Sequence, residues 1–107
     1  MERQARIHAF SRVAHRLAID RLRERPERLL EAIGVIERWR RQSGGSTRSD
    51  PYLDEWLSAL RDGVDAVERM ACADKEHAET LRSVSPLGRF ITVAERNGLL
   101  RQAREMA

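Results

Sequence analysis

Apolar residues recur at helical spacing from the first residues of the chain. Between residues 5 and 25 they fall three and four positions apart, so they share one face of a helix. This apolar stripe consists of Ile7, Phe10, Val13, Ala14, Leu17, Ala18 and Leu22. Pro26 suits the first turn of a second helix over residues 26–42. The core face of that helix is expected to contain Leu29, Leu30, Ile33, Ile36 and Trp39.

The segment 43–49 interrupts this pattern. It contains two glycines and four hydroxyl residues, a composition that predicts a loop. Asp50 and Pro51 then indicate a helix start, and the apolar spacing continues to Asp62 and Gly63. Two interpretations of the next stretch are open. Either Gly63 ends this helix and a short one follows over 65–72, or one long helix tolerates the glycine; the break is favoured.

The remaining segments are short and bounded by capping signals. Asp65 and Glu68 have the spacing of a capping box, and Asp74 can cap a helix over 75–83. A turn is expected at 85–88, and Thr92 with Glu95 predicts a capping box for a last helix over 93–106. We therefore predict an all-α fold, a small bundle of four to six helices in one domain over 1–107. The loop at 43–49 is expected to separate an N-terminal helix pair from a C-terminal helical half.

Composition limits the setting of the protein. The 107 residues include a single cysteine, Cys72, which excludes an internal disulfide and favours a reducing cytoplasm. No apolar run approaches the roughly 18 residues that a membrane span needs, and the N-terminus lacks the apolar core of a secretion signal. We expect a cytoplasmic protein with no membrane association, and the composition leaves a homo-oligomer open.

Charge is the property that bears most on the function of the chain. The chain is arginine-rich, since only one of its 20 basic residues, Lys75, is a lysine. Residues 1–41 contain eleven arginines and six acidic residues, a net charge of +5, whereas residues 42–107 have a net charge of −2. Arginine forms two-point contacts with carboxylates and phosphates, so the basic half predicts an acidic partner or nucleic acid. Internal arginine–acid pairs, or codon usage alone, would explain the same composition.

No set of residues indicates catalysis. His8 and His15 lie two helical turns apart, about 10 Å, which is too far to share a metal ion. Cys72 stands among apolar residues without an activating base. Gly44 and Gly45 lack the lysine and the strand–helix setting of a phosphate-binding loop. We predict no enzyme, no catalytic residue, no cofactor and no metal.

Several short motifs, spread over residues 10–100, resemble one group of bacterial proteins. These motifs are Val13–Arg16, Ile36–Trp39, Tyr52 with Trp56, Leu81–Gly88, and Glu95–Arg96. The resemblance is to small helical proteins encoded in toxin–antitoxin operons, whose toxin is often nucleotidyltransferase-like. It implies an antitoxin that neutralises its cognate toxin by direct binding. The chain shows no clear DNA-binding helix pair, so regulation of its own operon is not implied.

Partner-binding residues are expected where arginine meets an apolar anchor. Trp39 stands among arginines at a predicted helix end, the composition of interface hot spots. The other region is the ridge of Arg82, Arg89 and Arg96 near a helix-breaking Ser85–Pro86, although Leu87 and Phe90 could simply close the core. The predicted partner-binding residues are Trp39, Arg40, Arg82, Ser85, Pro86, Arg89 and Arg96. The alternative function is nucleic-acid binding through Arg12, Arg16, Arg38, Arg40 and Arg41.

Overall fold

A computed structural model describes the backbone of residues 3–105 and the side chains of residues 5–105. This part of the chain forms six α-helices and two 3₁₀ turns, which confirms the all-α prediction. The elements are α1 (Arg3–Glu24), η1 (Pro26–Arg28), α2 (Leu29–Ser43), α3 (Asp50–Asp62), α4 (Val64–Ala71), α5 (Glu76–Ser83), η2 (Leu87–Phe90) and α6 (Val93–Glu105). The end predicted for the last helix, at residue 106, lies outside the described residues.

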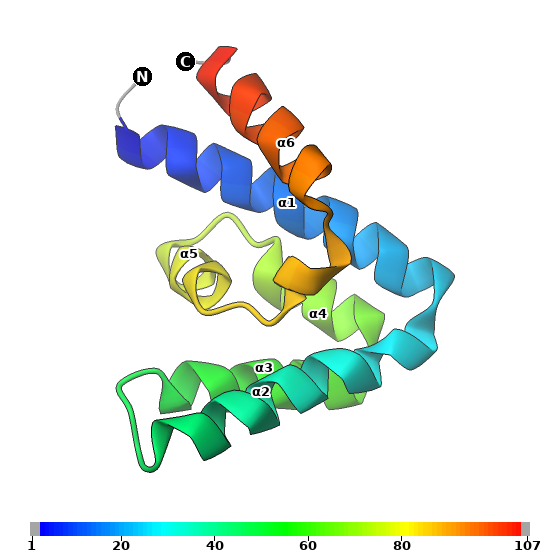
Figure 1. Ribbon diagram of the computed structural model, residues 1–107, viewed down its shortest axis with the longest axis vertical. Helices are drawn as coiled ribbons and strands as arrows, with labels where there is room; N and C mark the ends of the chain where they lie inside the picture. Colours follow the sequence, from blue (N-terminus) through cyan, green and yellow to red (C-terminus); the bar gives the residue numbers. More distant parts are fainter. Residues whose placement is uncertain (1–2, 106–107) are drawn as a thin grey trace.

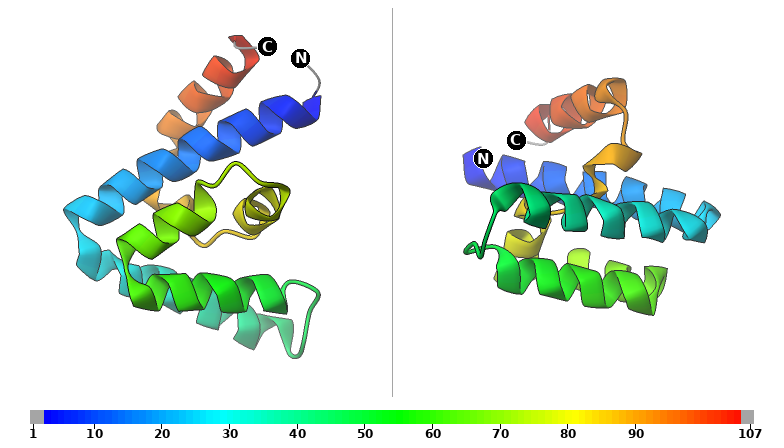
Figure 2. Two further views of the ribbon diagram at one scale, coloured as in Figure 1. Left: turned by 180° about the vertical axis from the view of Figure 1, so that it is seen from behind. Right: turned by 60° about the horizontal axis from the view of Figure 1, so that its bottom comes forward.

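The helices are arranged around α4 and α5 (Figure 1). Helices α2 and α3 run antiparallel and form one side, joined by the loop at 44–49. Helix α1 crosses the opposite side, where it contacts α4, α5 and α6. Figure 2 shows from behind that α1 spans most of the width of the molecule, with the start of α6 on its far side. None of the described helices is both long enough and apolar enough to cross a membrane.

Two glycines end helices where positive φ angles are needed. Gly44 follows α2 with φ = 70°, and Gly63 separates α3 from α4 with φ = 124°. A side chain is strained at such angles, so the broken version of the 60–72 segment is confirmed. The capping box predicted at Asp65 and Glu68 is wrong, because α4 already begins at Val64, after Gly63.

One hydrophobic cluster joins most of the elements. At its centre lies Trp56 of α3, whose side chain is fully buried and whose Nε1 donates a hydrogen bond to the Leu81 carbonyl over 2.8 Å. Leu87 and Phe90 of η2 belong to the same cluster, so they do close the core. The other buried members come from α1, α2, α3, α4 and α5: Ala18, Ile19, Leu22, Ala32, Ile36, Leu53, Leu57, Ala59, Leu60, Val67, Ala71 and Leu81.

Ion pairs connect the basic N-terminal half with acids of the C-terminal half. At the end of α1, Arg23 pairs with both Asp65 and Glu68 of α4, and Arg21 forms a two-point pair with Glu95 of α6. Each contact joins residues more than 40 positions apart. The uneven charge along the sequence is therefore partly neutralised within the fold.

Candidate functional site

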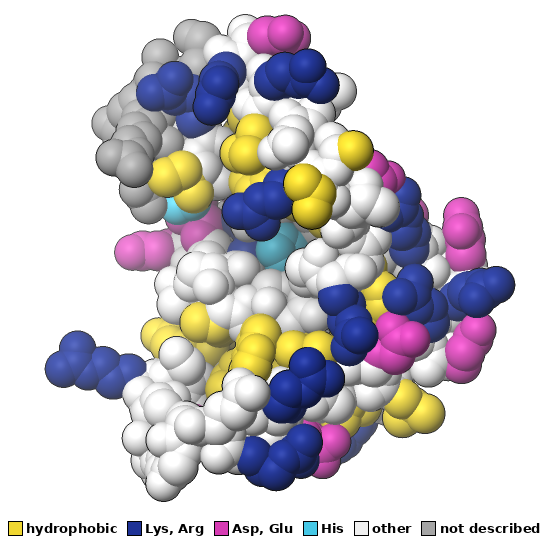
Figure 3. Space-filling view, viewed as in Figure 1, with side chains coloured by type: hydrophobic (Ala, Val, Ile, Leu, Met, Phe, Trp, Pro, Cys, Tyr) yellow, Lys and Arg dark blue, Asp and Glu magenta, His cyan; other side chains and the backbone are white. Residues whose placement is uncertain are grey.

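A hollow of about 500 Å³ lies between α1, the end of α5, η2 and the start of α6. Figure 3 shows it on the face toward the viewer, with a histidine and basic side chains inside it. We name it the His15–Arg82 hollow. Its lining residues are Phe10, Ser11, Ala14, His15, Ala18, Arg82, Ser83, Ser85, Leu87, Gly88, Ile91, Thr92, Val93 and Arg96.

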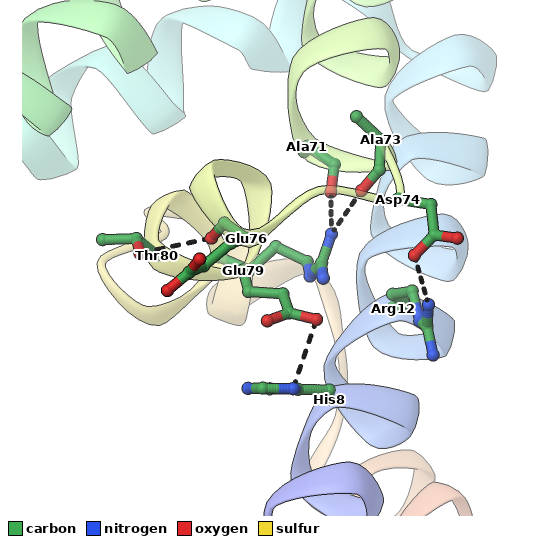
Figure 4. Close-up of polar contacts among 9 residues, drawn as sticks. His8, Arg12, Ala71, Ala73, Asp74, Glu76, Glu79 and Thr80 are labelled. Carbon is green, nitrogen blue, oxygen red and sulfur yellow. Dashed lines mark hydrogen bonds and ion pairs between the residues drawn. The ribbon is translucent and has the colours of Figure 1, made fainter.

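Arg82 is the most unusual residue of this hollow, because its charge is buried without a carboxylate partner. Its side chain is 4% exposed, and its Nη1 donates to the carbonyl of Ala71 over 2.7 Å and of Ala73 over 3.4 Å. Figure 4 shows both carbonyl groups, one from the last residue of α4 and one from the segment that follows it, pointing toward the same guanidinium group. The Nε and Nη2 atoms are buried and have no hydrogen-bond partner in the described chain.

The carboxylates nearest to Arg82 are held by other residues. Asp74 accepts a hydrogen bond from Arg12 of α1 over 3.2 Å, and Glu79 lies 3.2 Å from His8 (Figure 4). Burial and the neighbouring charge of Arg12 lower the pKa of Arg82 from its ordinary value. Because a guanidinium group stays protonated in proteins, Arg82 brings a positive charge into the hollow.

His15 is the second buried polar residue of the hollow, with 8% of its surface exposed. Its Nδ1 lies 2.7 Å from the Ser11 carbonyl, which can only accept, so Nδ1 carries the proton. Burial lowers the pKa of His15, and the charge of Arg82 lowers it further. The ring is therefore neutral near pH 7, and its buried, unpartnered Nε2 is a hydrogen-bond acceptor.

The charges and surfaces of the hollow are complementary to an anion. Its lining contains two arginines and no aspartate or glutamate. Phe10, Leu87 and Ile91 supply an apolar wall. The Arg96 guanidinium lies 5.6 Å from the centre of the Phe10 ring, a cation–π contact that places a second positive charge beside that wall.

Trp39 lies in a separate, smaller hollow between α2, α3 and the loop that joins them. This Trp39 hollow measures about 250 Å³ and includes Arg40 and Val84. Trp39 is 37% exposed. Arg40 donates to Asp54 over 2.6 Å and to the Asp50 carbonyl over 3.2 Å, and its Nε has no partner among the described residues.

The predicted partner-binding residues are thus divided between two hollows. Trp39 and Arg40 line one, whereas Arg82, Ser85 and Arg96 line the other. The short segment 83–85 contributes to both, because Val84 lines the Trp39 hollow and its two neighbours line the larger one. Outside the two linings, Pro86 is buried and Arg89 is exposed.

The residues predicted for nucleic-acid binding do not form one free basic surface. Arg12 pairs with Asp74, Arg16 lies 3.3 Å from Glu68, and Arg40 pairs with Asp54. The other two, Arg38 and Arg41, are exposed on α2.

Sequence reasoning missed the role of His15 in the hollow. It considered His15 only as a metal ligand, and it placed Arg82 on a ridge with Arg89 and Arg96. The signal that could have pointed to His15 was its position beside Ala14 and Ala18 on the apolar stripe of α1, which predicts a buried histidine.

Comparisons with known proteins give no relative: no family model matches the chain, and no curated protein and no solved structure is similar to it.

Proposed function

We propose that this chain is a protein-binding inhibitor of the antitoxin class, which neutralises a cognate toxin by direct contact and performs no chemistry. The resemblance noted above implies this function, together with a toxin of nucleotidyltransferase-like type. Inhibition of such a toxin takes place in the cytoplasm, the setting that the single cysteine favours.

The observation that carries this proposal is the position of Trp39. The core is built around Trp56, which is fully buried, whereas Trp39 stays 37% exposed beside a hollow. Tryptophan and arginine are the residues most enriched among interface hot spots, and here Trp39 and Arg40 lie side by side. An exposed tryptophan at a concave surface supports docking of a partner side chain there.

The expected contact is apolar anchoring combined with arginine pairing. Trp39 would supply apolar area at the centre of the contact, and the exposed Arg38 and Arg41 on the same helix would pair with carboxylates of the toxin. Nucleic-acid binding has less support, because three of its five predicted arginines already pair with acids of this chain.

The test is co-expression of the chain with the protein encoded beside its gene. We expect relief of growth inhibition and a stoichiometric complex that copurifies. Trp39→Ala should weaken that complex by about 30-fold or more, the effect of losing a hot spot. Leu30→Ala is the matched control, because Leu30 lies on the same helix, is 73% exposed and does not line the Trp39 hollow.

The absence of both a complex and relief of toxicity would contradict the proposal. Recovery of nucleic acid that is released by salt, with no protein partner, would favour the alternative function instead.

A further inference from the structure

The His15–Arg82 hollow contains buried hydrogen-bonding groups that the described chain leaves unpaired. A buried donor or acceptor without a partner costs free energy, so natural structures contain few of them. Here three such atoms belong to two residues of one hollow: His15 Nε2, Arg82 Nε and Arg82 Nη2.

We infer that this hollow binds a small organic oxyanion that carries its own hydrogen-bond donor. The size of the hollow, about 500 Å³, falls within the usual range for small-molecule sites. This inference goes beyond the antitoxin proposal and uses residues of the other hollow.

The negative charge of the ligand is required by Arg82. Its two unpaired nitrogens, Nε and Nη2, need acceptors, and a charged acceptor also compensates the buried guanidinium charge. Since no carboxylate of the described residues lines the hollow, we expect that charge to come from the ligand. Arg96 adds a second positive charge near Phe10.

The hydrogen-bond donor of the ligand is required by His15. Because its Nδ1–H donates to the Ser11 carbonyl, the neutral ring presents Nε2 as an acceptor. An oxyanion without a proton would place an oxygen lone pair against the lone pair of Nε2. A P–OH group, or a hydroxyl next to a carboxylate, satisfies His15 and Arg82 together.

The body of the ligand is expected to be partly apolar. Phe10, Leu87 and Ile91 line the hollow, and their apolar surface would contact a hydrocarbon or aromatic group rather than a bare inorganic ion. The shared chemistry is thus a phosphate or carboxylate with a neighbouring O–H group on an apolar body. Phosphates and 2-hydroxycarboxylates are its two sources.

The test compares pairs of anions that differ mainly in the hydrogen-bond donor. The first pair is inorganic phosphate and sulfate at pH 7 and equal ionic strength, because only phosphate keeps a proton there. The second is mandelate and phenylacetate, which differ by one hydroxyl group. Binding to the full chain is followed by calorimetry and by the NMR signals of the His15 ring.

We expect phosphate to bind at least about tenfold more tightly than sulfate, and mandelate to bind at least about tenfold more tightly than phenylacetate. Sulfate and phenylacetate offer no hydrogen-bond donor, so they leave Nε2 of His15 unsatisfied. A preference in only one pair would identify which source the site accepts. The His15 ring signals should shift only with the preferred anions.

Variants assign the effect to the two residues. Arg82→Met should abolish binding, whereas Arg69→Met removes an exposed arginine of α4 outside the hollow and should leave it unchanged. His15→Phe keeps a ring beside Trp56 and should remove the preference within each pair, even if Arg82→Met fails to fold.

Equal binding of both members of each pair, or unchanged binding by His15→Phe, would overturn the inference. So would the absence of binding by any of the four anions. Loss of toxin binding in Arg82→Met without anion binding would show that the hollow accepts a partner side chain instead. That last result would leave the antitoxin proposal intact.

Discussion

Arginine side chains meet different surroundings at the end of α1 and in the hollow near its middle. At the end, Arg21 and Arg23 are partly exposed and pair with carboxylates of α6 and α4. In the hollow, Arg82 is buried and binds two backbone carbonyls but no carboxylate. Over the described residues, the fold pairs several arginines with distant acids but leaves the most buried arginine, Arg82, without one, so general arginine enrichment does not explain Arg82.

The largest expected effect comes from removing the core side chain that packs against the hollow. Trp56 contacts the His15 ring, with 6.2 Å between ring centres, and donates to the Leu81 carbonyl next to Arg82. Trp56→Ala should destabilise the fold by about 3–5 kcal/mol, because it leaves a large cavity in the core. Chemical denaturation measures this change.

Trp56→Phe is the control, since it retains a ring and loses only the indole hydrogen bond to the Leu81 carbonyl, which still accepts from the Val84 backbone N–H. The lost hydrogen bond should cost about 0.5–1.5 kcal/mol. A loss below 1 kcal/mol for Trp56→Ala would mean that this tryptophan does not support the core.

The second prediction is that acid weakens the Arg21–Glu95 pair at the end of α1. The hydrogen bonds from Arg21 and from the Thr92 backbone hold the pKa of Glu95 at about 2, below its ordinary 4.5. As the pH falls, the unfolded chain takes up this proton first, so the stabilisation present above about pH 4.5 is lost toward pH 2. Glu95→Gln should remove this part of the acid dependence of the unfolding free energy.

Unfolding curves recorded from neutral to acid pH test this sign. Glu37→Gln, at an exposed position of α2, is the matched loss of one negative charge. An acid dependence that is the same in Glu95→Gln and in the parent chain would show that the Arg21 pair adds no stability.

The third prediction contrasts the same substitution in the two regions. Arg82→Met should change the free energy of unfolding by no more than about 1 kcal/mol, because relief of the buried charge offsets the lost bonds to Ala71 and Ala73. Arg21→Met removes the pair with Glu95 and the 2.7 Å bond to the Phe90 carbonyl, and should lower the melting temperature.

Thermal and denaturant unfolding of both variants decide this contrast. A loss above about 3 kcal/mol in Arg82→Met would identify Arg82 as a structural link between α4 and α5, as expected when breaking a buried charged contact.

Helix ends that depend on neighbouring residues were predicted correctly from the sequence. The helix break at Gly63 follows from its own backbone angle, and the Thr92–Glu95 capping box forms as its spacing indicates. The same spacing at Asp65 and Glu68 misled, because both carboxylates pair with Arg23, 42 and 45 positions away in the chain.

The hollow could not be derived from the sequence for the same physical reason. Arg82 was expected on a ridge with Arg89 and Arg96, but it is buried by the packing of α5 against α1 and α4. His15 and Arg82 meet only after those helices pack. Two carboxylates, Asp74 and Glu79, could have neutralised Arg82. Instead, each contacts a residue of α1, Arg12 and His8 respectively.

The smallest expected effect concerns Trp39, which lies in neither region. Trp39→Ala should change the free energy of unfolding by less than about 1 kcal/mol, because a partly exposed side chain contributes little to a core that Trp56 already fills. Denaturant unfolding measures this directly, with Leu30→Ala as the exposed control on the same helix. A loss of 3 kcal/mol or more, the usual cost of deleting a core tryptophan, would make Trp39 a structural residue and remove the main support for partner binding there. A small loss combined with a weakened complex would assign its exposed ring to recognition.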